Sequence, residues 1–365
     1  MTSSLVATGI QFPDSSIQTS AVLNPAFKNR IINGAMMIDQ RNAGASVTAN
    51  DGVFPVDRFK FNVAVNGKGT GQQSTTAPAG FINSLLFTSN SAYTVGASEN
   101  FNIDHYVEGL NVADLGWGTA NAATVTLSFW VRSSLTGTFG GSVNNSASNR
   151  SYPFSYTISA ANTWEQKSIT IAGDTSGTWL TTNGSGIKLH FSLGTGTTFS
   201  GTAGAWAGTN YVSATGATSV VGTSGATFYI TGVQLEKGST ATSFDYRPYG
   251  TELALCQRYF EMIYKTWGTF STTSIFRING RFATKKRAQP SATIYATTVY
   301  AENYGVSTTT TSSPALGGNY SSSDFYDQPI SGFTTAYGTN TVGAAGNNSD
   351  TTTWANNFVG FSAEL

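Results

Sequence analysis

The spacing of apolar residues changes once along the chain, between residues 231 and 260. Up to Leu235, apolar and polar residues alternate with the period of two that is typical of β-strands. Pro248 and Gly250 then interrupt the pattern, because proline and glycine disfavour regular secondary structure. After this break the apolar residues fall at helical spacing, at Leu253, Cys256, Tyr259, Phe260 and Ile263. We therefore predict a strand, a turn and an amphipathic helix over residues 251–265.

The chain before this break predicts a β-sandwich. Short stretches that read as strands recur at 31–38, 56–61, 81–88, 101–110, 124–133, 152–158, 164–171, 187–193 and 227–235. In the clearest of them, Leu127, Phe129 and Val131 face one side, and Trp130 and Arg132 face the other. No helical stretch separates these strands, so we expect an antiparallel sandwich, of which a jelly roll is the commonest closed form.

The chain after the break predicts a smaller β-rich module. Strands are expected at 274–279 and 281–283, joined at Gly280, and at 292–299, with FVGFSAEL as a closing strand. Beyond residue 300, aromatic residues are separated by small polar ones, a combination found in recognition loops. We predict that four of these aromatic residues bind a ligand: Tyr320, Tyr326, Tyr337 and Trp354. The alternative is that each packs in the core of an oligomer.

Three stretches predict contacts between chains. Residues 1–30 are too few to fold alone, and their apolar residues around Pro13 suggest two short strands that need a partner. The predicted helix is marginal in isolation, and three copies meeting on an axis would bury its apolar stripe. Residues 194–226 form a loop that is long for a compact domain, so we expect it to pack against a neighbouring subunit. Alternatively, Trp206 and Tyr211 of this loop form a platform for sugar stacking.

Composition supports β structure and excludes several partners. Only 10% of the residues are charged, against about 25% in an ordinary globular domain. The abundant glycine, serine, threonine and asparagine suit short strands joined by turns. The 19 basic and 19 acidic residues cancel, so we expect neither nucleic acid nor an anionic membrane surface as a partner. No apolar run is long enough to insert into a membrane, and no signal peptide is expected.

The sequence contains no convincing catalytic or metal-binding motif. His105 and His190 lie in different predicted strands, without the spacing of a zinc site. Cys256 is the only cysteine and has no partner for a disulfide. Asp104 and Glu108 share a strand face but lie about 13 Å apart, too far for paired glycosidase carboxylates. We therefore expect no enzymatic activity, no cofactor and no metal.

Three stretches resemble one family of proteins. VQLEKGSTATSFDYRPYGTELALCQRYF resembles the sequence that ends the jelly-roll module of phage and prophage tail-fibre proteins. NRIINGAMMIDQRNAGASV with VDRFKF resembles the opening of the same module, and FVGFSAEL resembles the end of the chain. The resemblance implies a jelly roll like that of carbohydrate-binding modules, a homotrimer, and a structural junction between modules. The junction residues are Gln234, Glu236, Arg247, Leu253, Cys256, Tyr259, Phe260 and Ile263.

These inferences predict a mainly β homotrimer with four regions. They are a virion-attachment segment (1–30), a jelly-roll β-sandwich (31–250), a trimerisation helix (251–267) and a small β-rich head (268–365). The resemblance implies a receptor-binding protein of the phage tail, assembled in the bacterial cytoplasm and carried in the virion. It would attach to other tail proteins through its first segment and bind a bacterial surface polysaccharide through the head. The alternatives are a structural adaptor or decoration protein without a receptor, and a polysaccharide depolymerase.

Overall fold

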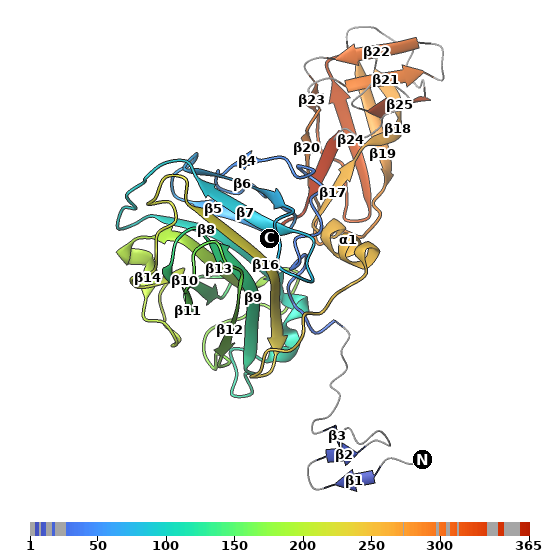
Figure 1. Cartoon of the computed structure of the whole chain (residues 1–365). Helices are drawn as coiled ribbons and strands as arrows, with labels where there is room; N and C mark the ends of the chain where they lie inside the picture. The colour runs from blue at the N-terminus through green and yellow to red at the C-terminus, as the bar shows by residue number, and fades with distance from the viewer. Residues whose placement is uncertain are drawn as a thin grey trace.

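Antiparallel strands dominate the chain, which forms a large sandwich, a smaller C-terminal module and a short N-terminal sheet (Figure 1). The computed structural model describes residues 4–6, 9–11, 17–18, 27–272, 274–296, 299–303, 307–311, 314–333, 342–346 and 358–365. Within these ranges one α-helix, α1 (Tyr249–Gln257), lies between the sandwich and the C-terminal module. None of the helices in the described ranges is long and apolar enough to cross a membrane.

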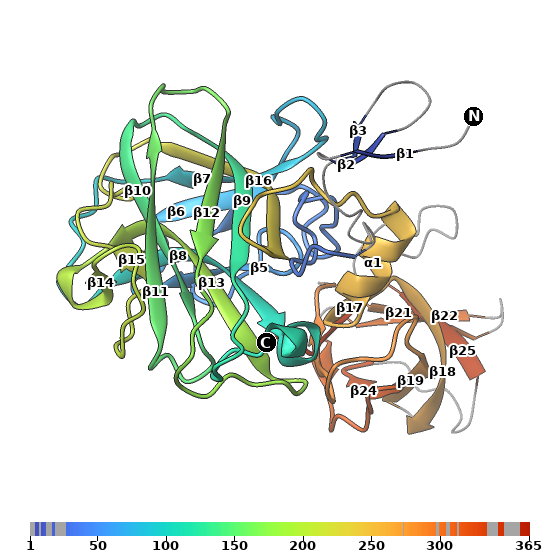
Figure 2. The same ribbon diagram turned by 90° about the horizontal axis from the view of Figure 1, so that it is seen from below.

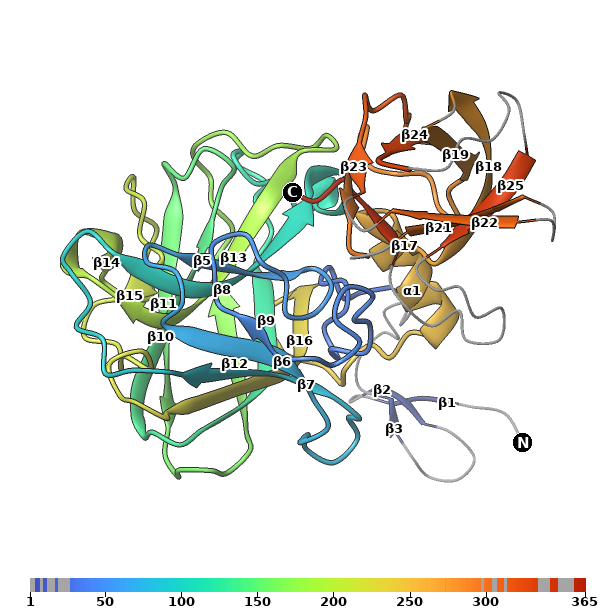
Figure 3. The same cartoon turned by 90° about the horizontal axis from the view of Figure 1, so that it is seen from above.

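The sandwich consists of two antiparallel sheets packed face to face (Figure 3). The five-stranded sheet has the order β11 (Ser151–Ile158), β10 (Gly137–Asn144), β13 (Ser185–Thr195), β8 (Asn100–Glu108) and β5 (Phe59–Val63). The six-stranded sheet has the order β12 (Glu165–Ile171), β9 (Val125–Ser133), β16 (Thr227–Lys237), β7 (Ser84–Ser89), β6 (Gly69–Ser74) and β4 (Val47–Thr48). The 3₁₀ helices are η1 (Gly109–Asn111), η2 (Ala113–Leu115) and η3 (Thr197–Phe199).

The core of the sandwich lies between the two sheets and is rich in phenylalanine. Leu127, Phe129 and Val131 of β9 are fully buried, as their alternation predicts. The Phe129 ring meets Phe191 of the opposite sheet edge to face, with ring centres 5.1 Å apart. Each such buried side chain contributes about 2 kcal/mol to the free energy of unfolding. The predicted antiparallel sandwich is confirmed.

The predicted opening strand at 31–38 is wrong, because residues 32–35 form a turn and none of residues 31–38 lies in a strand. Asn33 and Met36 have φ angles of 62° and 56°, left-handed values that a strand does not contain. The Asn33 side chain holds the turn by donating to the carbonyl of Ile38 at 2.8 Å and accepting from its amide at 2.9 Å. Met36 and Ile38 are nevertheless buried, so their apolar side chains indicate packing in the core and not a strand.

Strand β10 was missed because its sequence, GTFGGSVN, is rich in glycine. Gly141 packs closely against the neighbouring strands, since a Cβ there would lie 2.3 Å from the carbonyl oxygen of His190. Only glycine fits such an approach between strands.

The long loop at 194–226 packs against its own sandwich, and the expected contact with a neighbouring subunit stays a prediction. Val220 and Val221 are fully buried, and β14 (Ser200–Gly201) pairs in parallel with β15 (Ser213–Ala214). The Trp206 ring contacts the rings of Trp117 and Trp179, with ring centres 5.4 Å and 5.5 Å away. The Tyr211 ring packs over Gly201. Both proposed platform residues therefore make internal contacts.

The C-terminal module (residues 260–365) contains two antiparallel sheets. The smaller has the order β17 (Phe260–Ile263), β26 (Val359–Ser362) and β20 (Ser291–Ile294). The larger has the order β22 (Ser307–Thr311), β21 (Val299–Asn303), β25 (Val342–Gly346), β18 (Lys265–Thr272), β19 (Ile275–Arg281), β24 (Phe325–Ser331) and β23 (Ala315–Leu316). Gly280 does not join two strands as predicted but continues β19, where it pairs with Tyr326 of β24 and leaves room for the Tyr326 ring.

Helix α1 is shorter than predicted and ends at Gln257. Tyr259 lies in a turn, and Phe260 to Ile263 form β17, which pairs with β26. The helical spacing of these residues was accidental, because aromatic and β-branched residues also favour strands. The N-terminal strands β1 (Ser4–Val6), β2 (Gly9–Gln11) and β3 (Ile17–Gln18) form one antiparallel sheet, with one strand more than predicted.

Candidate binding face and the junction behind it

Gln234 and Glu236 of β16 hold the segment that follows this strand. The Gln234 amide donates to the Glu236 carboxylate at 2.8 Å and accepts from the backbone N–H of Asp245 at 2.8 Å. Glu236 in turn accepts from the backbone N–H of Thr242 at 2.9 Å and from its hydroxyl at 2.6 Å. Both side chains are buried, so these bonds satisfy polar groups that would otherwise be costly to bury.

Arg247 joins the start of the sandwich to α1. Its guanidinium donates to the backbone carbonyls of Asn29 and Ile31 and pairs with the Glu252 carboxylate at 3.2 Å. The two carbonyl contacts join residues more than two hundred positions apart, so Arg247 holds together distant parts of the chain at the junction.

Helix α1 buries its apolar side within its own chain. Cys256 and Tyr259 are fully buried with Ile32 and Ile38, and Leu253 packs at the edge of this cluster. Burial raises the pKa of the Cys256 thiol well above its usual range. Residues 31–38 thus cover the apolar side of α1 without a second chain, so burial of this helix does not require a trimer, and the homotrimer stays a prediction.

A second contact at the junction fixes the turn between α1 and β17 to the five-stranded sheet. Arg258 pairs with the buried Glu108 carboxylate at 2.6 Å, and the Tyr259 hydroxyl donates to the same carboxylate at 2.6 Å. Burial by itself would raise the pKa of Glu108, but these two donors hold it below its usual value. Nearby, the buried Lys286 pairs with Glu261 of β17 at 2.6 Å.

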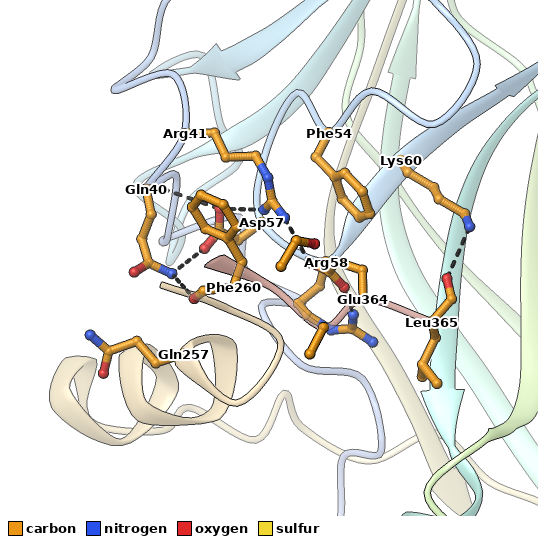
Figure 4. Close-up of polar contacts among 12 residues, drawn as sticks. Gln40, Arg41, Phe54, Asp57, Arg58, Lys60, Gln257, Phe260, Glu364 and Leu365 are labelled. Atoms are coloured by element: carbon orange, nitrogen blue, oxygen red, sulfur yellow. Dashed lines mark hydrogen bonds and ion pairs between the residues drawn. The ribbon is translucent and has the colours of Figure 1, made fainter. Parts of the chain in front are cut away.

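The end of the chain is clamped against the sandwich (Figure 4). Glu364 pairs with both Arg41 and Arg58, whose side chains are 7% and 2% exposed. Arg41 also pairs with Asp57 at 3.2 Å, and Lys60 donates to the carbonyl of Leu365 at 3.0 Å. The C-terminal module is thus attached to the sandwich by buried ion pairs as well as by the chain itself.

Aromatic rings complete the clamp on both sides. The Arg41 guanidinium lies 3.6 Å from the ring centre of Phe260, and the Arg58 guanidinium lies 3.6 Å from that of Tyr259. Such cation–π contacts strengthen when water is excluded. Burial raises the pKa of Asp57 to about 6, against the opposing effects of Arg41 and Gln40.

The outer face of β18, β19 and β24 in the C-terminal module has a different composition. Arg277 of β19 pairs through Nε with Asp327 of β24 at 2.6 Å, and its guanidinium lies 4.6 Å from the ring centre of Tyr320. The backbone N–H of Tyr320 donates to the carbonyl of Asp327 at 3.2 Å. The Tyr320 ring is 59% exposed, so this cluster is held in place yet open to solvent.

The strand register extends this face beyond the Tyr320 cluster. Asn279 pairs with Asp327 and Arg281 with Phe325, so their side chains point to the same side as Arg277. Trp267 lies two residues before the pairing partner of Arg277 in β18, and it is 58% exposed. A hollow of about 590 Å³ is lined by Asn279, Gly280, Arg281, Asp324, Phe325, Tyr326 and Asp327. We call this surface the head face.

The structure places the predicted ligand-binding residues differently. Tyr320 lies on the head face. Tyr326 is only 6% exposed and its hydroxyl bonds to Thr266 at 2.6 Å, so it belongs to the core and offers no ring face for stacking. Tyr337 and Trp354 lie outside the described residues. The prediction missed the other residues of the head face: Trp267, Arg277, Asn279, Arg281, Phe325 and Asp327.

The histidines of the sandwich are packed internally. Nε2 of His105 bonds to the carbonyl of Ile32 at 3.0 Å, and Nδ1 of His190 pairs with Asp104 at 2.6 Å. Within the ranges that the structure describes, no three histidine, cysteine or acidic side chains gather as a metal site would require.

No family model matches the chain, and no curated protein matches it. Among solved structures, it is similar to the enzymatically active domain of tailspike protein 4 of bacteriophage CBA120, with 13% identity and a TM-score of 0.32. That match covers 62% of this chain and 24% of the tailspike chain, so this chain spans about a quarter of its length.

Two sugar-binding proteins are similar to this chain at a comparable level. One is a putative sugar binding protein from Bacteroides thetaiotaomicron, with 12% identity and a TM-score of 0.32 over 57% of this chain and 100% of that one. The other is the family 11 carbohydrate-binding module from Clostridium thermocellum, with 10% identity and a TM-score of 0.28 over 55% and 100%. Because these scores are low, they carry no conclusion about what this chain binds.

Proposed function

We propose that this chain is a receptor-binding protein of a phage tail fibre and that its head face binds a bacterial surface polysaccharide. The observation that carries the proposal is the cluster of Tyr320, Arg277 and Asp327, which is fixed by an ion pair and a ring contact and is open to solvent.

The chemistry of the head face suits a sugar. Exposed aromatic rings such as Tyr320 and Trp267 offer flat apolar surfaces, which can cover the C–H face of a pyranose ring. Asn279 and Arg281 lie beside them and supply hydrogen-bond donors for hydroxyl groups, while Asp327 supplies acceptors. Rings and polar groups thus meet on one surface, which is the usual composition of a site that fixes a polar ligand in one orientation.

The junction holds the head face in a fixed position relative to the sandwich. The ion pairs of Glu364 with Arg41 and Arg58 hold the C-terminal module against the sandwich. In the proposed fibre, residues 1–30 attach the chain to other tail proteins, and three chains present three head faces. Linked sites that bind together raise the overall affinity without a new contact, so each single site needs only weak affinity.

The test is binding of the purified full chain to polysaccharide extracted from a host that the phage infects, measured by calorimetry. Tyr320→Ala should lower the affinity about tenfold, because one stacking ring is worth roughly 1–2 kcal/mol. Tyr264→Ala is the matched control: this tyrosine is 41% exposed and lies outside the head face. An unchanged affinity in Tyr320→Ala would contradict the assignment of the binding site to the head face. A wild-type chain that binds no polysaccharide would favour the alternative of a structural protein without a receptor.

A further inference from the structure

The charges in the hollow of the head face do not cancel. Asp327 pairs with Arg277 at 2.6 Å, and Asp324 pairs with Lys285 at 3.3 Å. Both carboxylates that line the hollow therefore have a cation as partner. Arg281 lines the same hollow and is exposed, and its guanidinium makes no hydrogen bond, ion pair or ring contact within the part of the chain that the structure describes. One positive charge of the hollow thus remains for a negatively charged partner.

Strand pairing places this guanidinium beside an exposed ring. Strands β18, β19 and β24 lie side by side in the C-terminal module (Figure 2). Arg281 of β19 is paired with Phe325 of β24, and Phe325 is 46% exposed. Directly opposed residues of paired strands have Cβ atoms about 5 Å apart on the same face of the sheet. Asn279 points to this face as well and supplies an amide.

This combination fits a sugar that carries a carboxylate. The Phe325 ring can cover the C–H face of a pyranose. In a uronic acid the carboxylate projects from the edge of the sugar ring, where the guanidinium of Arg281 can reach it. A guanidinium and a carboxylate are both planar and can form two parallel hydrogen bonds.

A phosphate monoester fits the hollow less well. It carries nearly two negative charges at neutral pH, whereas the hollow offers one unpaired cation. Asp324 and Asp327 line the same hollow, so a second negative charge would be repelled. The balance of charges therefore favours a ligand with one negative charge for each sugar ring.

We propose that the head face selects an acidic polysaccharide, with the carboxylate of a uronic acid bound to Arg281 and its sugar ring on Phe325. This inference rests on the proposed function and names the class of polysaccharide that the site takes. The whole chain has no net charge, so the selection comes from this local cation and not from a long-range field. Added salt should accordingly weaken binding by the wild-type chain, because the contact is exposed to solvent.

The experiment compares two forms of the polysaccharide extracted from the host in calorimetry with the full chain. One is the native polymer, and the other is the same polymer with its carboxylates chemically reduced to alcohols. Wild type should bind the native form about tenfold more tightly, because reduction removes one charge-assisted contact. This preference should disappear in Arg281→Gln, which has no charge. It should persist in part in Arg281→Lys, which keeps the charge without the planar group.

Two further variants separate this inference from the proposed function. Tyr320→Ala should lower the affinity for both polymers and keep the preference, because the ring that it removes carries no charge. Lys237→Gln removes a positive charge from the sandwich, where Lys237 is 49% exposed and pairs with Asp114 at 3.7 Å, and it should leave both affinities unchanged. Arg281→Gln should have the wild-type circular dichroism spectrum, because an exposed side chain is replaced.

Three results would overturn the inference and leave the proposed function in place. The first is equal binding of the native and reduced polymers by wild type, and the second is a preference that persists in Arg281→Gln. The third is binding that weakens when phosphate is removed from the polymer but not when its carboxylates are reduced. A wild-type chain that binds neither polymer would contradict the proposed function, and this inference with it.

Discussion

The junction and the head face use the same three chemical groups in opposite environments. At the junction, Arg58 pairs with Glu364 and lies on the Tyr259 ring, with the arginine side chain 2% exposed. On the head face, Arg277 pairs with Asp327 and lies by the Tyr320 ring, with the arginine side chain 34% exposed. An arginine, a carboxylate and a ring therefore do not by themselves indicate a binding site.

Burial separates the two roles. A buried ion pair has already lost its water, so removing one partner strands a charge in a low-dielectric region. An exposed pair keeps much of its hydration, adds little stability, and leaves groups accessible to a ligand. We therefore expect changes at the junction to affect folding and changes on the head face to affect binding.

The largest effect is expected for Glu364→Gln. This change leaves the buried guanidiniums of Arg41 and Arg58 without their shared carboxylate. Stranding a buried charge costs about 3–5 kcal/mol, so the free energy of unfolding should fall by that order. Urea denaturation followed by tryptophan fluorescence measures it.

Asp327→Asn is the matched change at the exposed pair, and it should cost less than about 1 kcal/mol. Equal losses in the two variants would show that burial does not distinguish the junction from the head face.

The next effect concerns pH. Because the pKa of Asp57 is raised from 3.8 to about 6 in the folded chain, the folded state binds a proton that the unfolded state has released between these values. Asp57 therefore contributes roughly 3 kcal/mol to the free energy of unfolding below about pH 4, and this contribution is lost as the pH rises to about 6. Urea denaturation at several pH values measures this slope.

Asp57→Asn provides the comparison for the pH series. Asparagine does not titrate, so the slope between pH 4 and pH 6 should be shallower in the variant by the amount that Asp57 contributes. If wild type and variant have parallel pH curves, the burial of Asp57 does not control its protonation.

The sequence predicted the parts of the fold in which apolar residues recur at a regular spacing. Strand alternation identified β9 and the sandwich core, because every second residue of such strands is buried. Helical spacing did not predict the structure after Gln257, because a few apolar residues fit both the helix period and the strand period. The pairing of β17 with β26 makes this stretch a strand. The turn at 31–38 depends on Asn33 and its contacts with Ile38, which the spacing of apolar residues does not reveal.

The head face was only partly predictable. Composition selected both Tyr320, which is exposed on the head face, and Tyr326, which is buried, because an exposed tyrosine and a core tyrosine are alike until burial is known. The stretch IFRINGR contains a usable signal: Arg277, Asn279 and Arg281 alternate with buried apolar residues and so mark an exposed strand face. That Asp327 and Phe325 lie beside them follows only from the pairing of β19 with β24.

Arg277→Lys is expected to change the free energy of unfolding least. It is also the most direct test of the comparison between the junction and the head face. Lysine keeps the positive charge but lacks the planar group that bonds to Asp327 while lying by the Tyr320 ring. Unfolding free energy should change by less than about 1 kcal/mol, because the pair is exposed. Polysaccharide affinity should fall several-fold, because Tyr320 loses the group that fixes its ring.

Lys237→Ala controls for the loss of an exposed ion pair as such, since Lys237 of the sandwich pairs with Asp114 at 3.7 Å and both side chains are 49% exposed. Its unfolding free energy should stay within about 0.5 kcal/mol of wild type, and calorimetry should show nearly unchanged affinity. If Arg277→Lys instead destabilises the chain and leaves affinity intact, the head-face arginine is structural like those of the junction. Exposure would then fail to separate a recognition cluster from a structural one.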